Sequence, residues 1–410
     1  MLEWANQFGI LTFFDNNNYH SVYNRYECLL AVGQIHVCND LGADPLADLL
    51  HFYDAHRDWI FGNINYDFKN RLEPKLGSDH EIKTRFPEFH FYIPETVCSI
   101  NAAHTELSIE TFGNPDTIYR EILRSSLPLH DYKPPKLEFK HTIEREQYLE
   151  TINQLRNHIK EGDCYEINFC GEGYCESNGI DPKGVFSRLN SLSPAPFAAY
   201  YKLGSQHMMC ASPERYLRKD GNTLMSQPIK GTARRGTDTE SDELIKTTLK
   251  NDLKERAENV MIVDLMRNDL ARCCEVGSIK VDELFGIYTY PQVHQMISTV
   301  SGQLRKGTPF TDAIRYSFPM GSMTGAPKYK VMQLIEQYEQ SRRELFSGTI
   351  GYINPEGDFD FNVVIRSLFY NATTGYLGYQ TGGAITWDSQ PEQEWEEMRL
   401  KAWALERIFM

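Results

Sequence analysis

Segments with strand patterns occur in groups along this chain, and amphipathic helix patterns lie between the groups instead of after every strand. Strand patterns include AAYYKLG, QHMMCASPERYLR and three later segments at 344–353, 361–370 and 376–386. Parallel strands need a crossover, usually a helix, between each pair, so this grouping favours antiparallel pairing. The sequence therefore predicts an α+β fold and not a doubly wound sheet.

Three segments have the period of amphipathic helices. The first, REQYLETINQLRNHIKEG, has apolar residues at Leu149, Ile152, Leu155 and Ile159 and a stop signal at Gly162. A single long helix is expected over about 239–272, and a last one over about 390–409.

The prolines at 134 and 135 in LPLHDYKPPKLEF interrupt any regular element. We place a boundary there, between an N-terminal lobe (1–135) and a second domain (136–410).

The net charge of −14 argues against nucleic acid or an anionic membrane as the main partner, because both need a basic surface. Nine cysteines without a C-x-x-C pair are typical of reduced thiols and not of a disulfide frame or zinc site. We find neither a signal-peptide pattern at the N-terminus nor an apolar run of about 18 residues, so a cytoplasmic location is expected.

Two pairs of carboxylates have the spacing of one helix face. Glu394, Glu397 and Lys401 share a face beside an apolar stripe, whereas Glu396 points toward solvent. Glu255 and Glu258 repeat the i, i+3 spacing on the earlier helix. Each pair is either a solvated ion-paired flank or part of an oxygen ligand set for Mg²⁺.

Two small-residue loops and several single residues also leave two interpretations open. PMGSMTGAPKYKV (319–331) is an anion cradle at a helix start or an ordinary helix start, and its spacing does not match a nucleotide-binding loop. Gly382 and Gly383 are either close backbone contacts to a carboxylate or a plain turn. Arg366, in an apolar strand pattern, needs a carboxylate from the protein or a ligand. Tyr352 and His294 are hydrogen-bonded core residues or pocket residues.

Lys230 stands in a short loop-like segment, SQPIKGTARRG. It is a surface charge, an anion contact or a nucleophile, and its position alone does not decide among the three.

Several motifs together resemble the chorismate-utilising enzymes. They are PIKGT (228–232), ENVMIVDLMRNDL (258–270), GSMTGAPK (321–328), SGTIGY (347–352), IRS (365–367) and the tail from Asp388 to Lys401. The resemblance is strong over 140–410 and weaker over 1–135, where FGNINYDFKN and RFPEFHFYIP also look similar. It implies two packed antiparallel sheets flanked by helices.

Within that family, PIKGT is similar to the aminodeoxychorismate branch, whereas anthranilate synthases carry PIAGT. The resemblance implies that Lys230 attacks C2 of chorismate and expels the C4 hydroxyl, after which ammonia attacks C4. A lysine must be neutral to attack, so its pKa is expected to be lowered by a desolvated pocket and by nearby cations, of which Mg²⁺ is the obvious one. Glu214, in SPERYL, matches the acid that protonates the leaving hydroxyl.

The resemblance also implies the other site residues. Glu258 and Glu397 match Mg²⁺ ligands, with Glu255 and Glu394 as further ligands or partners through water. Residues that match substrate contacts are Gly231, Thr232, His294, Thr324, Tyr352, Arg366, Gly382 and Gly383, and Lys401 adds positive charge. Residues 164–170, CYEINFC, replace a YQVNLS-like run and receive no role.

A separate glutamine amidotransferase subunit is the ammonia donor that the resemblance implies. The alternatives are anthranilate synthase component I, an isochorismate or salicylate synthase, and a non-catalytic chorismate-binding subunit. We identify no effector pocket in the N-terminal lobe, and we expect no allosteric control.

Overall fold

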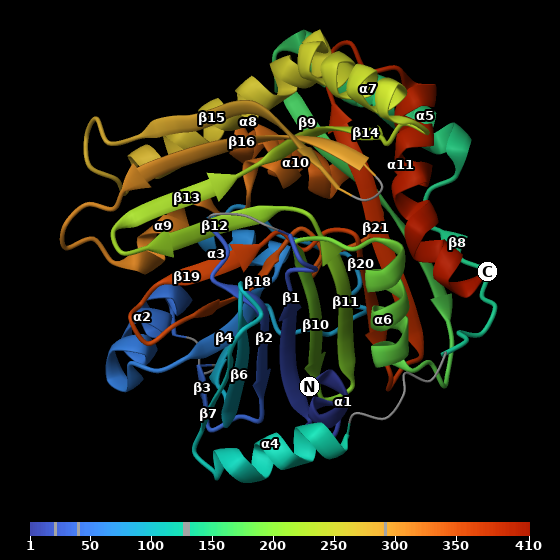
Figure 1. Cartoon of the computed structure of the whole chain (residues 1–410). Helices are drawn as coiled ribbons and strands as arrows, with labels where there is room; N and C mark the ends of the chain where they lie inside the picture. Colours follow the sequence, from blue (N-terminus) through green and yellow to red (C-terminus); the bar gives the residue numbers. More distant parts are fainter. Residues whose placement is uncertain (20–22, 39–41, 126–131, 291–292) are drawn as a thin grey trace.

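Two antiparallel β-sheets pack face to face, with helices around them (Figure 1). The computed structural model describes residues 1–19, 23–38, 42–125, 132–290 and 293–410. Every strand pair within the described residues is antiparallel. The predicted α+β class with two packed sheets is confirmed.

The first sheet runs from a short strand of the 319–331 segment to the N-terminal strands. Its order is β17 (Gly325–Ala326), β9 (Glu166–Glu176), β21 (Tyr376–Ile385), β20 (Ser367–Asn371), β11 (Gln206–Ser212), β10 (Phe197–Leu203), β1 (Ile10–Asp15), β2 (Tyr26–Val32), β6 (Thr96–Asn101) and β7 (Leu107–Thr111), with β8 (Lys140–His141) also paired to β9.

The second sheet begins at the strand that carries Lys230. Its order is β14 (Ile229–Arg234), β16 (Val293–Gln303), β13 (Thr223–Gln227), β12 (Arg215–Asp220), β19 (Phe359–Asn362), β18 (Thr349–Ile353), β4 (Ile60–Ile64), β5 (Phe89–Ile93) and β3 (His36–Cys38), with β15 (Lys280–Thr289) also paired to β16.

Strands from both sides of residue 135 share each sheet. In the first sheet β1 pairs with β10, and in the second β4 pairs with β18. The division into 1–135 and 136–410 stays a prediction about folding units, and the two segments are joined by continuous backbone hydrogen bonding.

The helices lie around the two sheets. They are α1 (Leu2–Ala5), α2 (Pro45–His56), α3 (Lys69–Leu72), α4 (Pro115–Arg124), α5 (Arg145–Glu161), α6 (Pro182–Leu192), α7 (Thr239–Asn251), α8 (Leu253–Ala271), α9 (Phe310–Ser317), α10 (Lys328–Tyr338) and α11 (Pro391–Glu406), with 3₁₀ turns η1 (Tyr66–Phe68), η2 (Gly321–Met323) and η3 (Arg407–Phe409). None of the helices in the described part of the chain is long and apolar enough to span a membrane.

The single helix predicted over 239–272 is wrong, because the chain forms two helices that meet at Asp252. The Asp252 backbone is extended (φ −63°, ψ 120°), and its side chain accepts a hydrogen bond from the Glu255 backbone N–H. An aspartate in this position caps a new helix and stops the preceding one. The helices predicted from the 142–162 and 390–409 patterns are confirmed as α5 and α11.

Two short connections carry the chain from one sheet to the other, and they run side by side. Residues 213–214 join β11 to β12, and residues 363–366 join β19 to β20. The Val363 N–H donates to the Glu214 carbonyl (3.0 Å), and the Ala211 N–H donates to the Arg366 carbonyl (3.1 Å). The expected continuous strand at 361–370 is therefore wrong, since the chain turns at Arg366, whose φ is +52°.

Apolar side chains from both sheets fill the space between them. The largest cluster joins Tyr201, Met208 and Phe369 of the first sheet to Phe91 and Phe361 of the second. A second cluster lies under α6, and a third packs α5, α10 and α11 against β9. The packed core leaves polar residues of both crossover connections at one end of the sandwich.

Candidate active site

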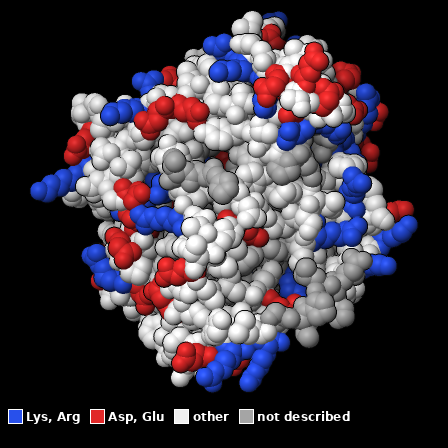
Figure 2. Space-filling view, in the orientation of Figure 1, with Lys and Arg blue, Asp and Glu red and all other residues white. Residues whose placement is uncertain are grey.

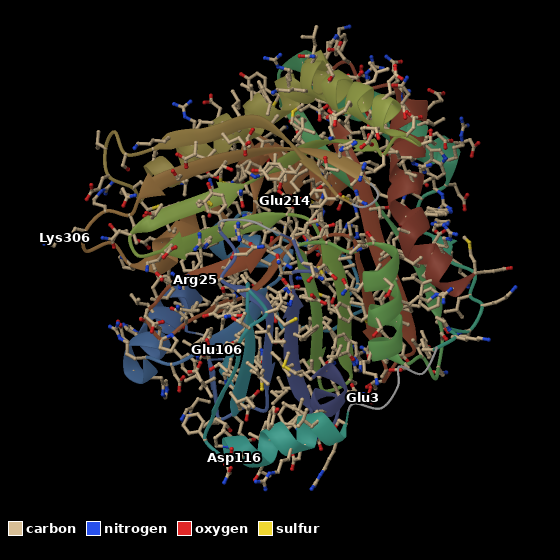
Figure 3. The ribbon with its side chains drawn as sticks, viewed as in Figure 1. Glu3, Arg25, Glu106, Asp116, Glu214 and Lys306 are labelled. Carbon is tan, nitrogen blue, oxygen red and sulfur yellow. The ribbon has the colours of Figure 1, made fainter. Side chains whose placement is uncertain are left out.

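A cavity of about 840 Å³ opens at the end of the sandwich where the crossover connections meet. Its walls come from β14, the first turns of α8, the end of β21 and one face of α11. Glu214 lies in the interior, away from labelled surface residues such as Glu3 and Lys306 (Figure 3). This volume falls in the range of pockets that take small molecules.

Lys230 reaches the cavity from an irregular part of β14. The pairing of β14 with β16 shifts register between Ile229 and Thr232, and Gly231 has a φ of +92° that favours glycine. A β-carbon at Gly231 would lie 3.1 Å from Glu255 Oε2. The glycine therefore allows both the irregular backbone and the close approach of α8.

The Lys230 side chain is 8% exposed, and its Nζ lies 2.6 Å from Glu166 Oε1. Burial pulls the pKa of Lys230 down, but the carboxylates of Glu166, Glu258 and Glu214 outweigh it and raise the pKa above its ordinary value. The protein carboxylates alone therefore favour the ammonium form of Lys230, whereas the expected lowering of its pKa depends on a nearby cation such as Mg²⁺ and stays a prediction.

Glu214 follows β11 in the first crossover connection, and its side chain lines the cavity. Burial raises the pKa of Glu214 to about 7, against the opposing effects of Ser322 and Lys230. A carboxyl group with this pKa holds a proton near neutral pH, as a general acid must.

The four predicted metal-binding glutamates lie on two facing helices, α8 and α11. Glu255, Glu258 and Glu397 line the cavity, and Glu394 is buried beside them. Burial raises the pKa of Glu258 to about 8, and Lys401 lowers the pKa of Glu397. The i, i+3 spacing thus points both carboxylate pairs into one region, as the helix geometry predicts.

These glutamates fit Mg²⁺ in their chemistry. Glu258 Oε1 is buried without a hydrogen-bond partner among the described residues, and Mg²⁺ prefers oxygen ligands. Two lysines form ion pairs with these carboxylates. Lys254 Nζ lies 3.2 Å from Glu394 Oε1 and 3.8 Å from Glu258 Oε1, and Lys401 Nζ lies 2.6 Å from Glu397 Oε1.

Within the described residues, the one set of at least three metal-capable side chains whose ligand atoms converge within 4.8 Å is His158, Glu161 and Asp163, none of which lines the cavity. Three of the four glutamates, Glu258, Glu394 and Glu397, would therefore have to exchange a lysine for the ion on binding Mg²⁺.

Arg366 lines the other end of the cavity, in the second crossover connection. It makes no hydrogen bond or ion pair with any side chain in the described ranges, and burial lowers its pKa against the opposing effect of Glu397. An unpaired guanidinium in a cavity is an attractive site for an anion.

Gly382 and Gly383 lie beside this end, and Lys401 Nζ donates to the Gly382 carbonyl (2.8 Å). A β-carbon at Gly383 would lie 3.4 Å from Glu394 Oε2 and 3.5 Å from Glu397 Oε1. A larger residue there would crowd the carboxylates.

Three predicted substrate contacts lie outside this cavity. Tyr352 lines a separate cavity of about 70 Å³ and packs against Phe14, Tyr26, Trp59 and Phe61. His294 is fully buried and hydrogen-bonded to Asp242 and Thr289. Thr324 is fully buried, and its hydroxyl donates to the Met320 carbonyl.

The structure brings two neighbouring residues into the cavity instead. Successive residues of a strand point to opposite faces, so Gln295 lines the cavity while His294 points to the other face, toward Asp242 of α7. Phe346, six residues before Tyr352, lines it as well. The alternation of side chains along a strand indicates that His294 and Gln295 lie on opposite faces. Nothing in the sequence indicates which of the two faces the cavity occupies.

The loop of the 319–331 segment contributes Ser322 and Met323 to the cavity wall. Its backbone N–H groups at Met323 and Thr324 already bond to the Met320 and Gly321 carbonyls. No residue of α10 lines the cavity, so the anion cradle predicted at this helix start does not face it.

The cavity collects basic side chains although the chain is acidic. Six lining residues are basic: Lys230, Arg234, Arg235, Lys254, Arg366 and Lys401. Four are acidic, and three of these, Glu214, Glu255 and Glu258, have a raised pKa. On the face in Figure 2, by contrast, Lys and Arg are interspersed with Asp and Glu around a largely uncharged centre. The cavity therefore suits an anionic ligand.

Two packed antiparallel sheets and a cavity that collects basic side chains at their crossover connections define an α+β protein whose cavity suits an anionic ligand. The chain belongs to the family of chorismate-binding enzymes, which it matches over residues 22–407.

Its relatives include aminodeoxychorismate synthases. It is 39% identical over 362 residues to the chloroplastic aminodeoxychorismate synthase of Arabidopsis thaliana, covering 83% of this chain and 39% of that protein. It is 39% identical over 260 residues to aminodeoxychorismate synthase component 1 of Escherichia coli (strain K12), covering 63% of this chain and 57% of that protein. The chain thus spans well under two thirds of these relatives' length.

Among solved structures, anthranilate synthase component I from Streptococcus pneumoniae TIGR4 superposes with a TM-score of 0.82 at 24% identity, covering 95% of this chain and 94% of that one. The isochorismate synthase MenF from Escherichia coli has a TM-score of 0.78 at 17% identity, covering 100% of this chain and 91% of that one. At these identities the likeness shows the shared fold.

Proposed function

We propose that the chain converts chorismate and ammonia to 4-amino-4-deoxychorismate, a precursor of para-aminobenzoate and folate. The observation that carries this proposal is a buried lysine, Lys230, on the wall of a cavity whose other groups include a proton-holding carboxyl, Glu214, and an unpaired arginine, Arg366. The similarity to aminodeoxychorismate synthases supports it.

Lys230 is the proposed nucleophile. Its Nζ forms a bond to C2 of chorismate while the ring double bond shifts and the C4 hydroxyl leaves as water with the proton of Glu214. Ammonia then attacks C4, the double bond shifts back, and the C2–Nζ bond breaks. Covalent catalysis of this kind divides one difficult substitution into two easier ones.

The two carboxylates of chorismate are proposed to bind at opposite ends of the cavity. Arg366 and the backbone at Gly382 and Gly383 hold the enolpyruvyl carboxylate. At the other end the N–H groups of Gly231 and Thr232 meet the ring carboxylate. Lys401, which donates to the Gly382 carbonyl, adds positive charge at the Arg366 end. Gln295 takes the ring-side position that the resemblance implied for His294. Phe346 lines the cavity in place of Tyr352, which the resemblance implied as a contact of the enolpyruvyl carboxylate.

Mg²⁺ is the proposed cofactor, held by Glu258 and Glu397 with Glu255 and Glu394 as further ligands or partners through water. Its charge would neutralise the ring carboxylate. A glutamine amidotransferase subunit is the proposed ammonia donor, and the name component 1 among the relatives supports such a partner. All nine cysteines are free, which fits the proposed cytoplasmic location.

Anthranilate synthesis is the second candidate, since one relative, 32% identical over 353 residues, is named anthranilate synthase component I-like protein. Lys230 argues against it, because the resembling anthranilate synthases carry alanine in this position.

The test is to incubate the purified chain with chorismate, Mg²⁺ and an ammonium salt and to identify the product by mass and ultraviolet spectrum. Aminodeoxychorismate is the expected product. Anthranilate, isochorismate or unchanged chorismate, with the same result after addition of an amidotransferase subunit and glutamine, would refute the proposal.

A further inference from the structure

A second carboxylate, Glu166 of β9, lies directly behind the cavity lysine. Glu166 Oε1 is 2.6 Å from Lys230 Nζ, and the two side chains are 1% and 8% exposed. Lys230 lines the cavity and Glu166 does not. Among the described residues, Lys230 is the one ion-pair partner of Glu166, and Glu166 Oε2 is buried without any hydrogen bond.

The backbone around Glu166 is held by the loop that carries the GSMTGAPK motif. Ala326 of β17 lies opposite Glu166, and the N–H groups of Tyr165 and Asn168 donate to the Ala326 and Thr324 carbonyls, each at 2.7 Å. Gly325 has a φ of +142°, and a β-carbon there would lie 2.0 Å from the Glu166 carbonyl oxygen. Because Gly325 has no side chain, the loop can pack directly against the backbone of β9 and fix its position.

A half-satisfied carboxylate in this position is costly while it carries a charge. Transfer of one proton across the 2.6 Å hydrogen bond converts the buried ion pair into a neutral amine and a neutral carboxyl group. Both neutral groups cost less to bury than the separated charges do. The geometry thus supplies a local acceptor for the proton that the lysine must lose.

We propose that Glu166 is the positioning residue that aims Lys230 Nζ at the substrate ring and accepts its proton, which rests on the nucleophilic role proposed for Lys230. The lysine ammonium gives one proton to Glu166, and its nitrogen lone pair then forms the bond to C2. The C4–O bond breaks, and the oxygen leaves as water with the proton of Glu214. Charge balances, since Glu166 ends neutral, Glu214 ends anionic and the new C–N bond carries the positive charge.

Other charged groups also act on Lys230 and must be considered in any pH profile. They come from every element around it: Glu258 and Glu255 of α8, Glu214 of the first crossover connection, and Glu397 of α11. Within the described residues none of them forms an ion pair with Lys230 inside 4.0 Å, so Glu166 alone is within reach for direct proton transfer.

Glu172, on the same strand, provides a matched control. It is also 1% exposed, and one oxygen lies 2.6 Å from a lysine, Lys83. Its other oxygen accepts a hydrogen bond from the Tyr376 hydroxyl, and it does not line the cavity. Glu172→Gln therefore removes an equally buried charge from β9 without touching the cavity.

The experiment compares Glu166→Gln with Glu172→Gln and the unchanged chain, using chorismate, Mg²⁺ and ammonium. Glutamine keeps a hydrogen bond to the lysine but cannot take its proton. At pH 7 we expect Glu166→Gln to lower kcat on the order of 10²-fold, with KM changed less than about threefold. The loss should shrink at least about fivefold by pH 9, because without the neighbouring charge the amine loses its proton to solvent more easily.

Glu166→Asp serves as a second variant if the glutamine variant does not fold. Aspartate keeps the negative charge, but its shorter side chain moves the carboxylate oxygen away from Lys230 Nζ. The kcat value should therefore fall while unfolding remains cooperative. Equal, small effects of Glu166→Gln and Glu172→Gln on kcat, or a loss that does not change with pH, would overturn the proposal.

Lys230→Arg separates this proposal from the one on which it rests. If Lys230→Arg is inactive and Glu166→Gln is fully active, the role of Glu166 is wrong and that of Lys230 stands. If Lys230→Arg is fully active, both roles fail.

Discussion

The two cavities of this protein differ in how their polar groups are satisfied. In the small cavity around Tyr352, Arg25 pairs with Asp220 and Asp358, and Asp360 pairs with Arg215. In the large cavity, Glu258, Gln295 and Ser322 each have a buried oxygen without a hydrogen bond among the described residues, and so does Glu166 behind it. The Glu258 oxygen has only the longer ion pair with Lys254, at 3.8 Å.

Eight such buried atoms occur among the described residues, and none belongs to the small cavity. Buried polar groups are normally hydrogen-bonded, so a concentration of unpaired ones indicates a site built for a ligand. The comparison favours the large cavity as the proposed reaction site, because buried polar atoms without hydrogen bonds lie in its wall and none lies in the wall of the small cavity.

The largest expected effect comes from removing the amine without removing its charge. Lys230→Arg keeps a cation beside Glu166 but cannot form the proposed bond to carbon, so kcat should fall more than about 10³-fold. Steady-state kinetics with chorismate and ammonium measure the loss, and intact-protein mass spectrometry tests for the adduct. The control is Lys83→Arg, at the lysine that pairs with Glu172 of β9, and this variant should retain activity.

Glu214→Gln should lower kcat by about 10²–10⁴-fold, because the leaving hydroxyl loses its acid. The pKa of Glu214 is about 7, so the unchanged chain should lose activity as pH rises through 7 and the acid gives up its proton. The residual activity of the variant should lack this decline. A rate that stays level from pH 6 to 8 in the unchanged chain would contradict the role of Glu214.

Arg366→Gln should raise KM for chorismate by about 10–100-fold, since a charge-assisted contact to a carboxylate is lost. Arg25→Gln, in the small cavity, removes a paired arginine and should change KM less than about twofold. Similar KM values for the two variants would show that the unpaired arginine does not bind substrate.

Glu258 offers a test of stability. Its pKa is 4.5 in the unfolded chain and about 8 in the folded one, so the folded state favours the protonated form. The stability that this proton contributes is complete below pH 4.5 and is lost as pH rises to 8. In metal-free buffer at pH 8, Glu258→Gln should therefore raise the free energy of unfolding by about 1–3 kcal/mol, and by less at pH 5.

Urea unfolding at both pH values measures the difference. Added Mg²⁺ should stabilise the unchanged chain more than the variant, because binding to the folded state alone raises its stability. Equal stabilisation of both proteins would count against Glu258 as a ligand.

The smallest effect is expected at Tyr352. Tyr352→Phe leaves the large cavity untouched, so kcat/KM should stay within about twofold of the unchanged chain. Gln295→Leu, at a lining residue with an unpaired oxygen, should lower kcat/KM by about 5–10-fold. A larger loss at Tyr352 than at Gln295 would mean that the assignment of the two cavities is reversed.

Local periodicity predicted part of the site well. The spacing of Glu394, Glu397 and Lys401 on one helix face, and of Glu255 with Glu258 on another, led to the carboxylate pairs that the structure brings together. The same reasoning located α5 and α11. It failed at Asp252, where a capping side chain ended one helix and began the next, and at Arg366, where the chain changes sheets.

The sequence by itself determined the fold class, the helix faces and the family, because periodicity and motif spacing are local properties of the chain. Only the tertiary structure decided that Glu166 meets Lys230 from 64 residues away, and that Gln295 and not His294 faces the cavity. Contacts between distant strands and the choice of strand face depend on register and packing of the whole sheet. Those same contacts set the charge state of Lys230, which no local motif contains.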